Sequence, residues 1–192
     1  MSSIKLESNA SGTGIFTIAS PNSNTNRTLT LPDNTGTVLT SATTTGFPAG
    51  SVIQVVSATY STQTVVASTS YTDTGLTASI TPTSASSKIL VIVSQSVGSG
   101  QNTNAARTFE LQLLRGATTI SDRDSYAYGG VGANGYFEIG LDGTQIILDS
   151  PATTSSTTYK TQGRMDSTAS NTSMTFQQGS GESTITLMEI AA

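Results

Sequence analysis

Short apolar groups separated by turn signals are the feature that most limits the fold of this chain of 192 residues. The groups are too rich in Thr, Val, Ser and Gly, and too short of a sustained stripe with a 3.6-residue period, to form helices. Their near-regular spacing predicts an all-β chain whose main part is an antiparallel β-sandwich, jelly-roll-like. The ten strand candidates are 52–56, 64–67, 76–80, 88–94, 108–114, 136–141, 145–149, 157–162, 173–176 and 184–190.

One candidate strand alternates cleanly between apolar and polar residues. Phe109, Leu111 and Leu113 occupy every second position, and Glu110 and Gln112 lie between them. Because successive side chains of a strand point to opposite faces, one face of this strand should be buried and the other wet.

Two other strands are apolar on both faces. The run 89–93 does not alternate, which predicts a central strand covered by the opposite sheet on one side and by another subunit on the other. The run 185–190 shows the same pattern less strongly, and it brings the C-terminus into the sheet. The longest loops are expected at 97–106 and 121–135.

The segment 26–40, NRTLTLPDNTGTVLT, predicts a β-hairpin ahead of these strands. Leu29 and Leu31 share a strand face, and Pro32 fits the entry to a turn that Asp33, Asn34 and Gly36 complete. A lone hairpin is marginally stable in water, so this one must pack against the downstream domain, sister chains or a virion surface. The text GFPAG then marks a boundary, which divides the chain into an arm at 1–46 and a head at 47–192.

The segment 12–40, GTGIFTIASPNSNTNRTLTLPDNTGTVLT, resembles the stem and attachment module of fibre and appendage proteins of tailed bacteriophages. Later text is similar, more weakly, to the globular heads of short marine-phage appendage proteins; it comprises SYTDTGLTASITPTSASSKILVIVSQSV, LLRGATTI, LDSPATTSSTTYK and TITLMEIAA. The resemblance implies a homotrimeric, β-rich virion component with a β-sandwich head. It also implies attachment to other virion proteins through the N-terminal arm.

Charge and cysteine content exclude several partners. Only 10% of residues are charged, the net charge is −4, and the eight Lys and Arg residues are spread thinly, so no nucleic-acid partner is expected. There is no cysteine, hence neither a disulfide framework nor a thiolate metal site.

The start, MSSIKLES, lacks an apolar core of signal-peptide length, and 89–93 is too short to span a bilayer. These features fit a protein that is made in the host cytoplasm, released by lysis and not inserted into a membrane, and the resemblance implies that it belongs to the virion.

The absence of histidine removes the usual general base, the Ser-His-Asp triad and imidazole metal ligands. Neither an enzyme nor a cofactor is therefore expected. Asp122 and Asp124 flank Arg123, and on a strand both carboxylates would share a face, as in a cation site or a glycosidase pair. The favoured interpretation is a solvated loop whose charges Arg123 balances.

The only notable aromatic cluster is YAYGGVGANGYF at 126–137. Tyrosines on a glycine-rich backbone can bind a sugar ring or a protein surface. The candidate receptor contacts are therefore Tyr126, Tyr128 and Tyr136, and the expected partner is a host cell-surface glycan or protein. The alternative is that these tyrosines pack at a subunit interface.

The sequence thus predicts a non-enzymatic structural protein of a phage particle, a trimeric appendage such as a short tail fibre or knob. A capsid decoration or head-fibre protein is the alternative, because the arm is a single short module and the sequence does not identify its docking partner. A polysaccharide-degrading tailspike would need a longer repetitive β-helix and a carboxylate site in a groove, and the sequence shows neither.

Overall fold

The computed structural model describes residues 47–101, 105–129, 137–166 and 173–192, together with 11–15, 22–26 and a few single positions up to 35. The side chains of 99–101, 105–108, 124–129 and 137–139 are not among those described. The chain divides into two compact units, Met1–Gly36 and Thr37–Ala192. The hairpin predicted at 26–40 lies outside the described residues, apart from four single positions.

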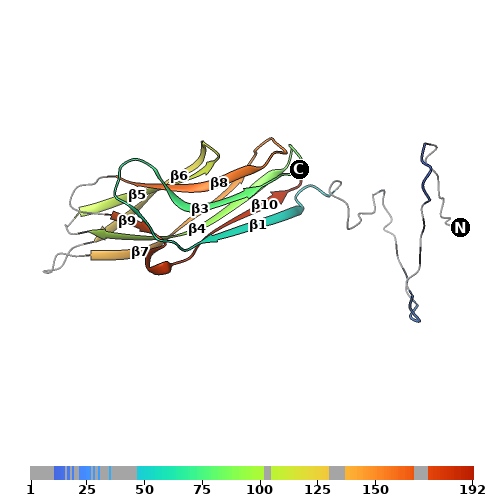
Figure 1. The fold of residues 1–192 in the computed structure, drawn as a ribbon, viewed down its shortest axis with the longest axis horizontal. Coiled ribbons are helices and arrows are strands. Elements are labelled where there is room, and N and C mark those ends of the chain that lie inside the picture. The colour runs from blue at the N-terminus through green and yellow to red at the C-terminus, as the bar shows by residue number, and fades with distance from the viewer. Residues whose placement is uncertain are drawn as a thin grey trace. The chain divides into compact units, whose positions relative to one another are not determined.

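Ten strands and one 3-10 turn form the secondary structure of the described residues (Figure 1). The turn η1 (Gln178–Ser180) is the only helical element among them, and none of them belongs to a helix able to cross a membrane. The all-β prediction is confirmed. The strands are β1 (Val52–Tyr60), β2 (Thr64–Val66), β3 (Thr72–Ile80), β4 (Lys88–Gln101), β5 (Ala105–Arg115), β6 (Thr118–Gly129), β7 (Phe137–Asp149), β8 (Thr157–Met165), β9 (Ser173–Phe176) and β10 (Ser183–Ile190).

The strands form two antiparallel sheets that pack as a sandwich (Figure 1). The six-stranded sheet has the order β1-β10-β4-β9-β2, and β7 pairs with the other side of β4. The four-stranded sheet has the order β3-β8-β5-β6. The long strand β4 organises the first sheet, because its first half pairs with β10, its second half with β9, and its full length with β7.

Three parts of the strand prediction were wrong. The expected loop at 121–135 is largely strand β6, which follows β5 through a tight turn at Gly116, where φ is +58°. The expected strands 136–141 and 145–149 are one strand, β7. Both β6 and β7 are edge strands, whose polar residues and glycines imitate turn signals in the sequence. The expected loop at 97–106 also shrinks, because β4 runs to Gln101 and β5 starts at Ala105.

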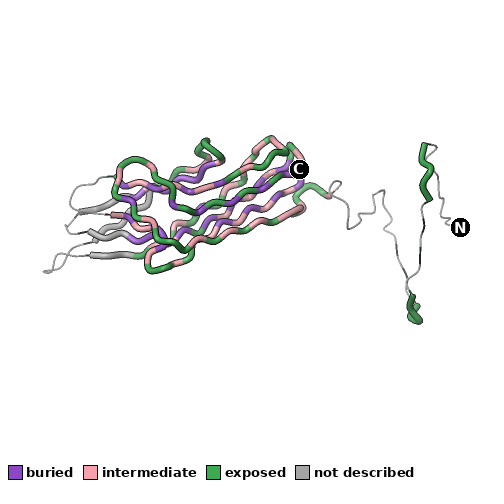
Figure 2. The backbone as a smooth tube through the Cα atoms, in the orientation of Figure 1, coloured by how far each residue is buried: buried purple, intermediate pink, exposed green. Residues whose placement is uncertain are grey.

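The burial predictions for the inner faces of the central strands are confirmed, and coverage of the outer face of β4 by another subunit stays a prediction. Phe109, Leu111 and Leu113 are buried. On β4, Ile89, Val91 and Val93 are buried against the opposite sheet, whereas the alternate residues, Leu90 and Ile92, are only half-buried. Figure 2 shows this alternation along the central strands. The inner face of β4 is thus covered within the protomer, and its outer face is not.

The core between the sheets consists of two apolar clusters separated by polar side chains. One cluster includes Ile89, Val91, Tyr159 and Leu187, and it lies at the end where β1 begins. The other includes Phe109, Met165, Met174 and Phe176, and it lies toward the opposite end. We call the separating residues the interior polar layer; they are the fully buried Thr74, Gln95, Thr161, Gln177 and Ser183.

Gln95 of β4 is the centre of this layer and links the two sheets. Its carbonyl accepts from the Thr161 hydroxyl of β8 at 2.8 Å, and its amide nitrogen donates to the Ser183 hydroxyl of β10 at 2.9 Å. The Thr74 and Thr161 hydroxyls are 2.5 Å apart, and the Gln177 amide lies 3.0 Å from the Ser183 hydroxyl. Hydrogen bonding inside the layer offsets the cost of burying these polar groups.

A buried carboxylate lies at the end of the sandwich where β1 begins. Glu189 of β10 has no exposed surface, and it accepts from the Gln54 amide at 2.6 Å and from both the backbone N–H and the hydroxyl of Thr83 at 2.7 Å. Burial raises the pKa of Glu189, but these hydrogen bonds outweigh burial and hold the pKa below its ordinary value. The charged carboxylate therefore ties β1 and the β3–β4 connection to β10.

We predict an acid-dependent loss of stability that arises from Glu189. A carboxyl whose pKa is lower in the folded state stabilises the fold above its unfolded-state pKa, and this contribution disappears as the pH falls through the folded-state pKa. The free energy of unfolding should therefore fall below about pH 4.5 more steeply for the wild type than for Glu189→Gln. Urea unfolding at pH 7 and at several acidic pH values measures this difference, and identical pH dependence in both proteins would contradict it.

Candidate interaction surface

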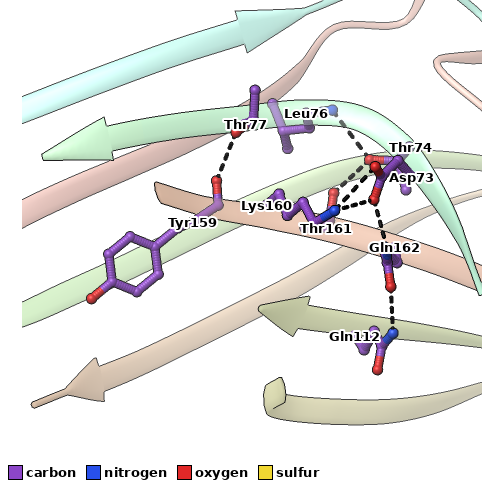
Figure 3. Close-up of polar contacts among 9 residues, drawn as sticks. All are labelled: Asp73, Thr74, Leu76, Thr77, Gln112, Tyr159, Lys160, Thr161 and Gln162. Carbon is purple, nitrogen blue, oxygen red and sulfur yellow. Dashed lines mark hydrogen bonds and ion pairs between the residues drawn. The ribbon is translucent and has the colours of Figure 1, made fainter. Parts of the chain in front are cut away.

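The outer face of the four-stranded sheet is covered by polar side chains that bond to one another across the strands. Lys160 of β8 forms an ion pair with Asp73 of β3 at 2.8 Å. The Gln162 amide donates to Asp73 at 2.6 Å and its carbonyl accepts from the Gln112 amide at 2.7 Å, as Figure 3 shows. Gln112 in turn accepts from the Thr119 hydroxyl at 3.1 Å. These bonds form one hydrogen-bonded row across β3, β8, β5 and β6.

A second group on this sheet, the Tyr71 cluster, consists of Tyr71, Glu110, Asp122 and Arg164. The Tyr71 hydroxyl lies 2.8 Å from Asp122 Oδ1 and 2.9 Å from Glu110 Oε2. A phenol carries one hydrogen and donates to one carboxylate at a time. Arg164 bonds to Glu110 Oε2 through Nε at 2.7 Å and Nη2 at 2.5 Å, and its guanidinium lies 4.6 Å from the centre of the Tyr71 ring.

The chemistry of the Tyr71 cluster is that of a brace between strands. Burial, together with hydrogen bonding to the two carboxylates, raises the pKa of Tyr71 well above its ordinary value, so the phenol stays protonated and is no general base at neutral pH. Asp122 and Glu110 are both engaged, and Arg164 balances part of their charge. Within the described part of the chain, no three acidic side chains gather closely enough to hold a metal ion.

The structure changes the interpretation of Asp122 and Asp124. They belong to strand β6 and not to a loop, and their backbone partners are Gln112 and Glu110 of β5. Asp122 bonds to Tyr71, which the sequence did not single out, and the side chain of Asp124 is not among those described. The one sequence signal near this cluster was the prediction that Glu110 and Gln112 lie on a wet outer face. Both lie on the outer face, but Glu110 is half-buried and Gln112 is buried beneath its polar neighbours, so the expectation of a wet position was wrong for Gln112.

Two of the three predicted contact tyrosines belong to one end of the sandwich. Tyr126 and Tyr128 lie on β6, paired with Thr108 and Ala106 of β5, and their side chains are not described. Tyr136 lies outside the described residues, next to the first residue of β7. We call this end the distal end (Figure 1). Strands β4, β6 and β8 end there, and β5, β7 and β9 begin there. The chain enters β1 at the opposite end, where Val52 pairs with Ile190.

The outer face of the six-stranded sheet differs in character from that of the four-stranded sheet. Each large apolar side chain that is exposed in the described part of the head lies on the six-stranded sheet. Most of these residues, together with half-buried ones between them, form one patch, which we call the apolar face. It consists of Val55, Leu90, Ile92, Ile146, Leu148 and Met188.

The described residues define the class of the head: an antiparallel β-sandwich of two sheets, with one polar and one apolar outer face. No family model and no curated protein matches the sequence. Similar solved structures include infectious bursal disease virus, Gx strain, at 13% identity with a TM-score of 0.32, covering 72% of this chain and 37% of that chain. The structure of the Gt strain is similar at 14% identity with a TM-score of 0.31, covering 74% of this chain and 39% of that chain. The crystal structure of the VP2 subviral particle of the same virus is similar at 15% identity with a TM-score of 0.31, covering 72% of this chain and 37% of that chain. The chain spans well under half of those chains, and similarity at this level supports no conclusion about function.

Proposed function

We propose that this chain is a structural protein of a tailed-bacteriophage particle: a homotrimeric appendage that docks by its arm, residues 1–46, and projects its head, residues 47–192, for adhesion to a host or surface. The resemblance of residues 12–40 to the attachment modules of such proteins supports the assignment. The sandwich is also the fold that the resemblance implies for the head.

The observation that carries the proposal is that the chain enters the head at one end and its predicted contact segment belongs to the other. The chain enters β1 at one end, and the strand ends that flank 102–104, 130–136 and 167–172 meet at the other (Figure 1). Connections at the end of a sandwich can vary without disturbing the core, so binding residues are often located there. A head anchored at the β1 end places the strand positions of Tyr126 and Tyr128, and the start of β7 that follows Tyr136 in the sequence, away from the anchor.

The proposed role is binding and not catalysis. The chain has neither histidine nor cysteine, and the two carboxylates of the Tyr71 cluster are occupied by Tyr71 and Arg164. The described strands form a sandwich, whereas a depolymerising tailspike requires a repetitive β-helix with a substrate groove. Protein partners in the particle and a host-surface glycan or protein are the ligands that this function requires.

The test is to locate the protein in the particle and to remove the arm. Cryo-electron microscopy of intact particles should place three copies of the head at one attachment point on the tail, and density on the outer capsid would assign the protein to capsid decoration instead. Deleting residues 1–40 should leave a folded head that no longer joins the particle. Normal incorporation of the shortened chain would move the docking surface to the head.

We predict that replacing Tyr126, Tyr128 and Tyr136 together by Ala abolishes attachment to cells or glycans and leaves the thermal unfolding temperature nearly unchanged. Truncating a contact residue weakens binding to the receptor, whereas truncating a tyrosine packed in a subunit interface lowers the stability of the assembly by a few kcal/mol. The triple Phe variant keeps the aromatic area and is the matched control. Unchanged attachment with lowered stability would leave only the interface role.

A further inference from the structure

A hollow on the outer face of the six-stranded sheet lies where two glycines pair. Gly98 of β4 and Gly140 of β7 are directly opposite one another, so neither strand places a side chain on the outer face at this point. A Cβ atom on Gly140 would have no atom within 4 Å, because the space above it is open. The hollow has a volume of about 360 Å³, which is enough for a small ligand, and we call it the glycine hollow. It is lined by Ser96, Val97, Gly140, Leu141, Asp142 and Gln178.

The turn η1 forms one wall of the glycine hollow. The side chain of Gln178 lies so close to Gly98 that it leaves no room for a Cβ atom there. The preceding residue, Gln177, is buried in the interior polar layer, and its N–H donates to the Ser96 carbonyl at 3.0 Å. These contacts hold Gln177 at a φ of +53°, which is uncommon for a residue with a side chain. The core of the head therefore positions Gln178 at the hollow before a ligand binds, which lowers the entropy cost of binding.

Three side chains around the hollow carry hydrogen-bonding groups that the protein itself does not use. They are the Ser96 hydroxyl from β4, the Asp142 carboxylate from β7 and the Gln178 amide from η1. None of these groups bonds to another group in the part of the chain that the structure describes. Ser96 and Asp142 pair directly across the two strands, so their side chains share the outer face. Val97 and Leu141 turn their side chains to the core, so they line the hollow with backbone.

The charges near the hollow argue against an ionic ligand. Lys88 is the only basic residue in the strands of this sheet, and it lies eight residues along β4 from Ser96, about 27 Å in an extended strand. Asp142 would repel a phosphate or a carboxylate, and no cation is near enough to compensate. A calcium ion takes about six to eight oxygen ligands, several of them carboxylates, whereas Asp142 is the single acidic residue among the described ones that line the hollow.

The free groups match a neutral ring that carries several hydroxyls. A carboxylate only accepts hydrogen bonds, whereas a hydroxyl and an amide both donate and accept. Two neighbouring hydroxyls of a sugar can donate to the two oxygens of Asp142, while a third bonds to Gln178 and Ser96. Hydrogen bonds to a charged group are the stronger ones, so Asp142 should contribute most of the affinity.

We infer that the glycine hollow binds one neutral hexose unit of a surface glycan, an inference that deepens the proposed adhesion by naming a site and a ligand class. The sugar ring lies over Gly140, between Asp142 on β7 and Gln178 on η1. Each copy of the chain carries one such site, so the proposed homotrimer carries three. Weak sites that bind one surface together give a much higher avidity than a single site does.

Three variants of the full-length chain test the site. Gly140→Val fills the hollow with a side chain that strands favour and removes no polar group. Asp142→Asn keeps the shape of the side chain and removes its charge. Glu182→Gln is the matched control for the charge, because Glu182 is exposed and does not line the hollow.

Saturation-transfer NMR measures binding of the single sugars, with D-glucose, D-galactose and D-mannose as separate probes. At least one of them should bind the wild type and Glu182→Gln in the millimolar range. Gly140→Val should abolish this binding, and Asp142→Asn should weaken it about tenfold. The thermal unfolding temperature of all three variants should stay close to that of the wild type.

Several results would overturn the inference. One is that none of the three hexoses binds the wild type at tens of millimolar, and another is that inorganic phosphate or calcium binds more tightly than the hexoses. Equal hexose binding by Gly140→Val would also overturn it. If Gly140→Val unfolds, the comparison of Asp142→Asn with Glu182→Gln decides, and equal affinity in these two variants would contradict the site.

Attachment to cells separates the inference from the proposed function. If the wild type attaches to cells, and Gly140→Val and Asp142→Asn attach equally well without any hexose binding, only the inference fails. If the wild type binds a hexose in the hollow and does not attach to cells, the proposed adhesion fails and the sugar site stands.

Discussion

A chain that ends at Glu182 should contain no folded head. This truncation removes β10, the strand that lies between β1 and β4 in the six-stranded sheet. It also removes Ile185 and Leu187, which have no exposed surface, and Ser183, which bonds to Gln95 in the interior polar layer. Loss of one buried Ile or Leu side chain costs about 2–5 kcal/mol, so loss of the whole strand exceeds the total stability of about 5–15 kcal/mol that is usual for a domain.

Circular dichroism and thermal unfolding measure this result. The shortened chain should show no cooperative transition and should be digested rapidly by protease. The matched control ends at Ala191, which keeps the hydrogen bonds between Ala191 and the backbone of Gly50 and Ser51 and deletes only the exposed Ala192. A cooperative transition in the chain that ends at Glu182 would mean that the sandwich closes without its C-terminal strand.

Replacing Gly163 by Ala should destabilise the head by about 3 kcal/mol, which lowers the thermal midpoint by on the order of 10 °C. Gly163 of β8 faces Phe176 of the opposite sheet. A Cβ atom at this position would lie 2.2 Å from Phe176 Cζ and 2.8 Å from Met174 Cε, distances that real contacts do not reach. The two sheets approach so closely here that the backbone takes the place of a side chain.

The control for this prediction is a second glycine within a strand. Gly140 of β7 has no neighbouring atom within 4 Å of the position that a Cβ would occupy, so Gly140→Ala should be nearly neutral. Adding Phe176→Leu to Gly163→Ala should restore part of the lost stability, because leucine has no atom at the Cζ position. Equal midpoints for Gly163→Ala and Gly140→Ala would refute the close approach.

Sequence patterns identified most of the central strands because those strands carry one-sided or two-sided apolar periodicity. The alternation of Phe109, Leu111 and Leu113, and the two-sided run at 89–93, were sufficient to predict the buried inner positions of β5 and β4. The edge strands β6 and β7 were misassigned because an edge tolerates polar residues and glycine, as at Asp142 and Gly143. Composition alone does not distinguish a polar edge strand from a loop.

The polar contacts were harder to predict than the strands. Tyr71, Glu110, Asp122 and Arg164 come from four separate segments, and only the strand order brings them together. The register that joins β5 to β6 and β8 is set by long-range pairing, which local sequence does not reveal. The apolar face was foreseen only where it crosses β4 and, less strongly, β10, since its other members lie on β1 and β7.

The interior polar layer has a consequence for how the head can vary between related proteins. Shifting β4 by one residue would turn Gln95 out of the core and remove one hydrogen-bond partner from each of the hydroxyls of Thr161 and Ser183, so the layer favours one alignment of β4, β8 and β10. Beyond it, the cluster around Phe176 shares no side chain with the cluster around Leu187. Substitutions can therefore accumulate in the cluster around Phe176 and at the distal end while the half of the sandwich that contains the cluster around Leu187 keeps its packing.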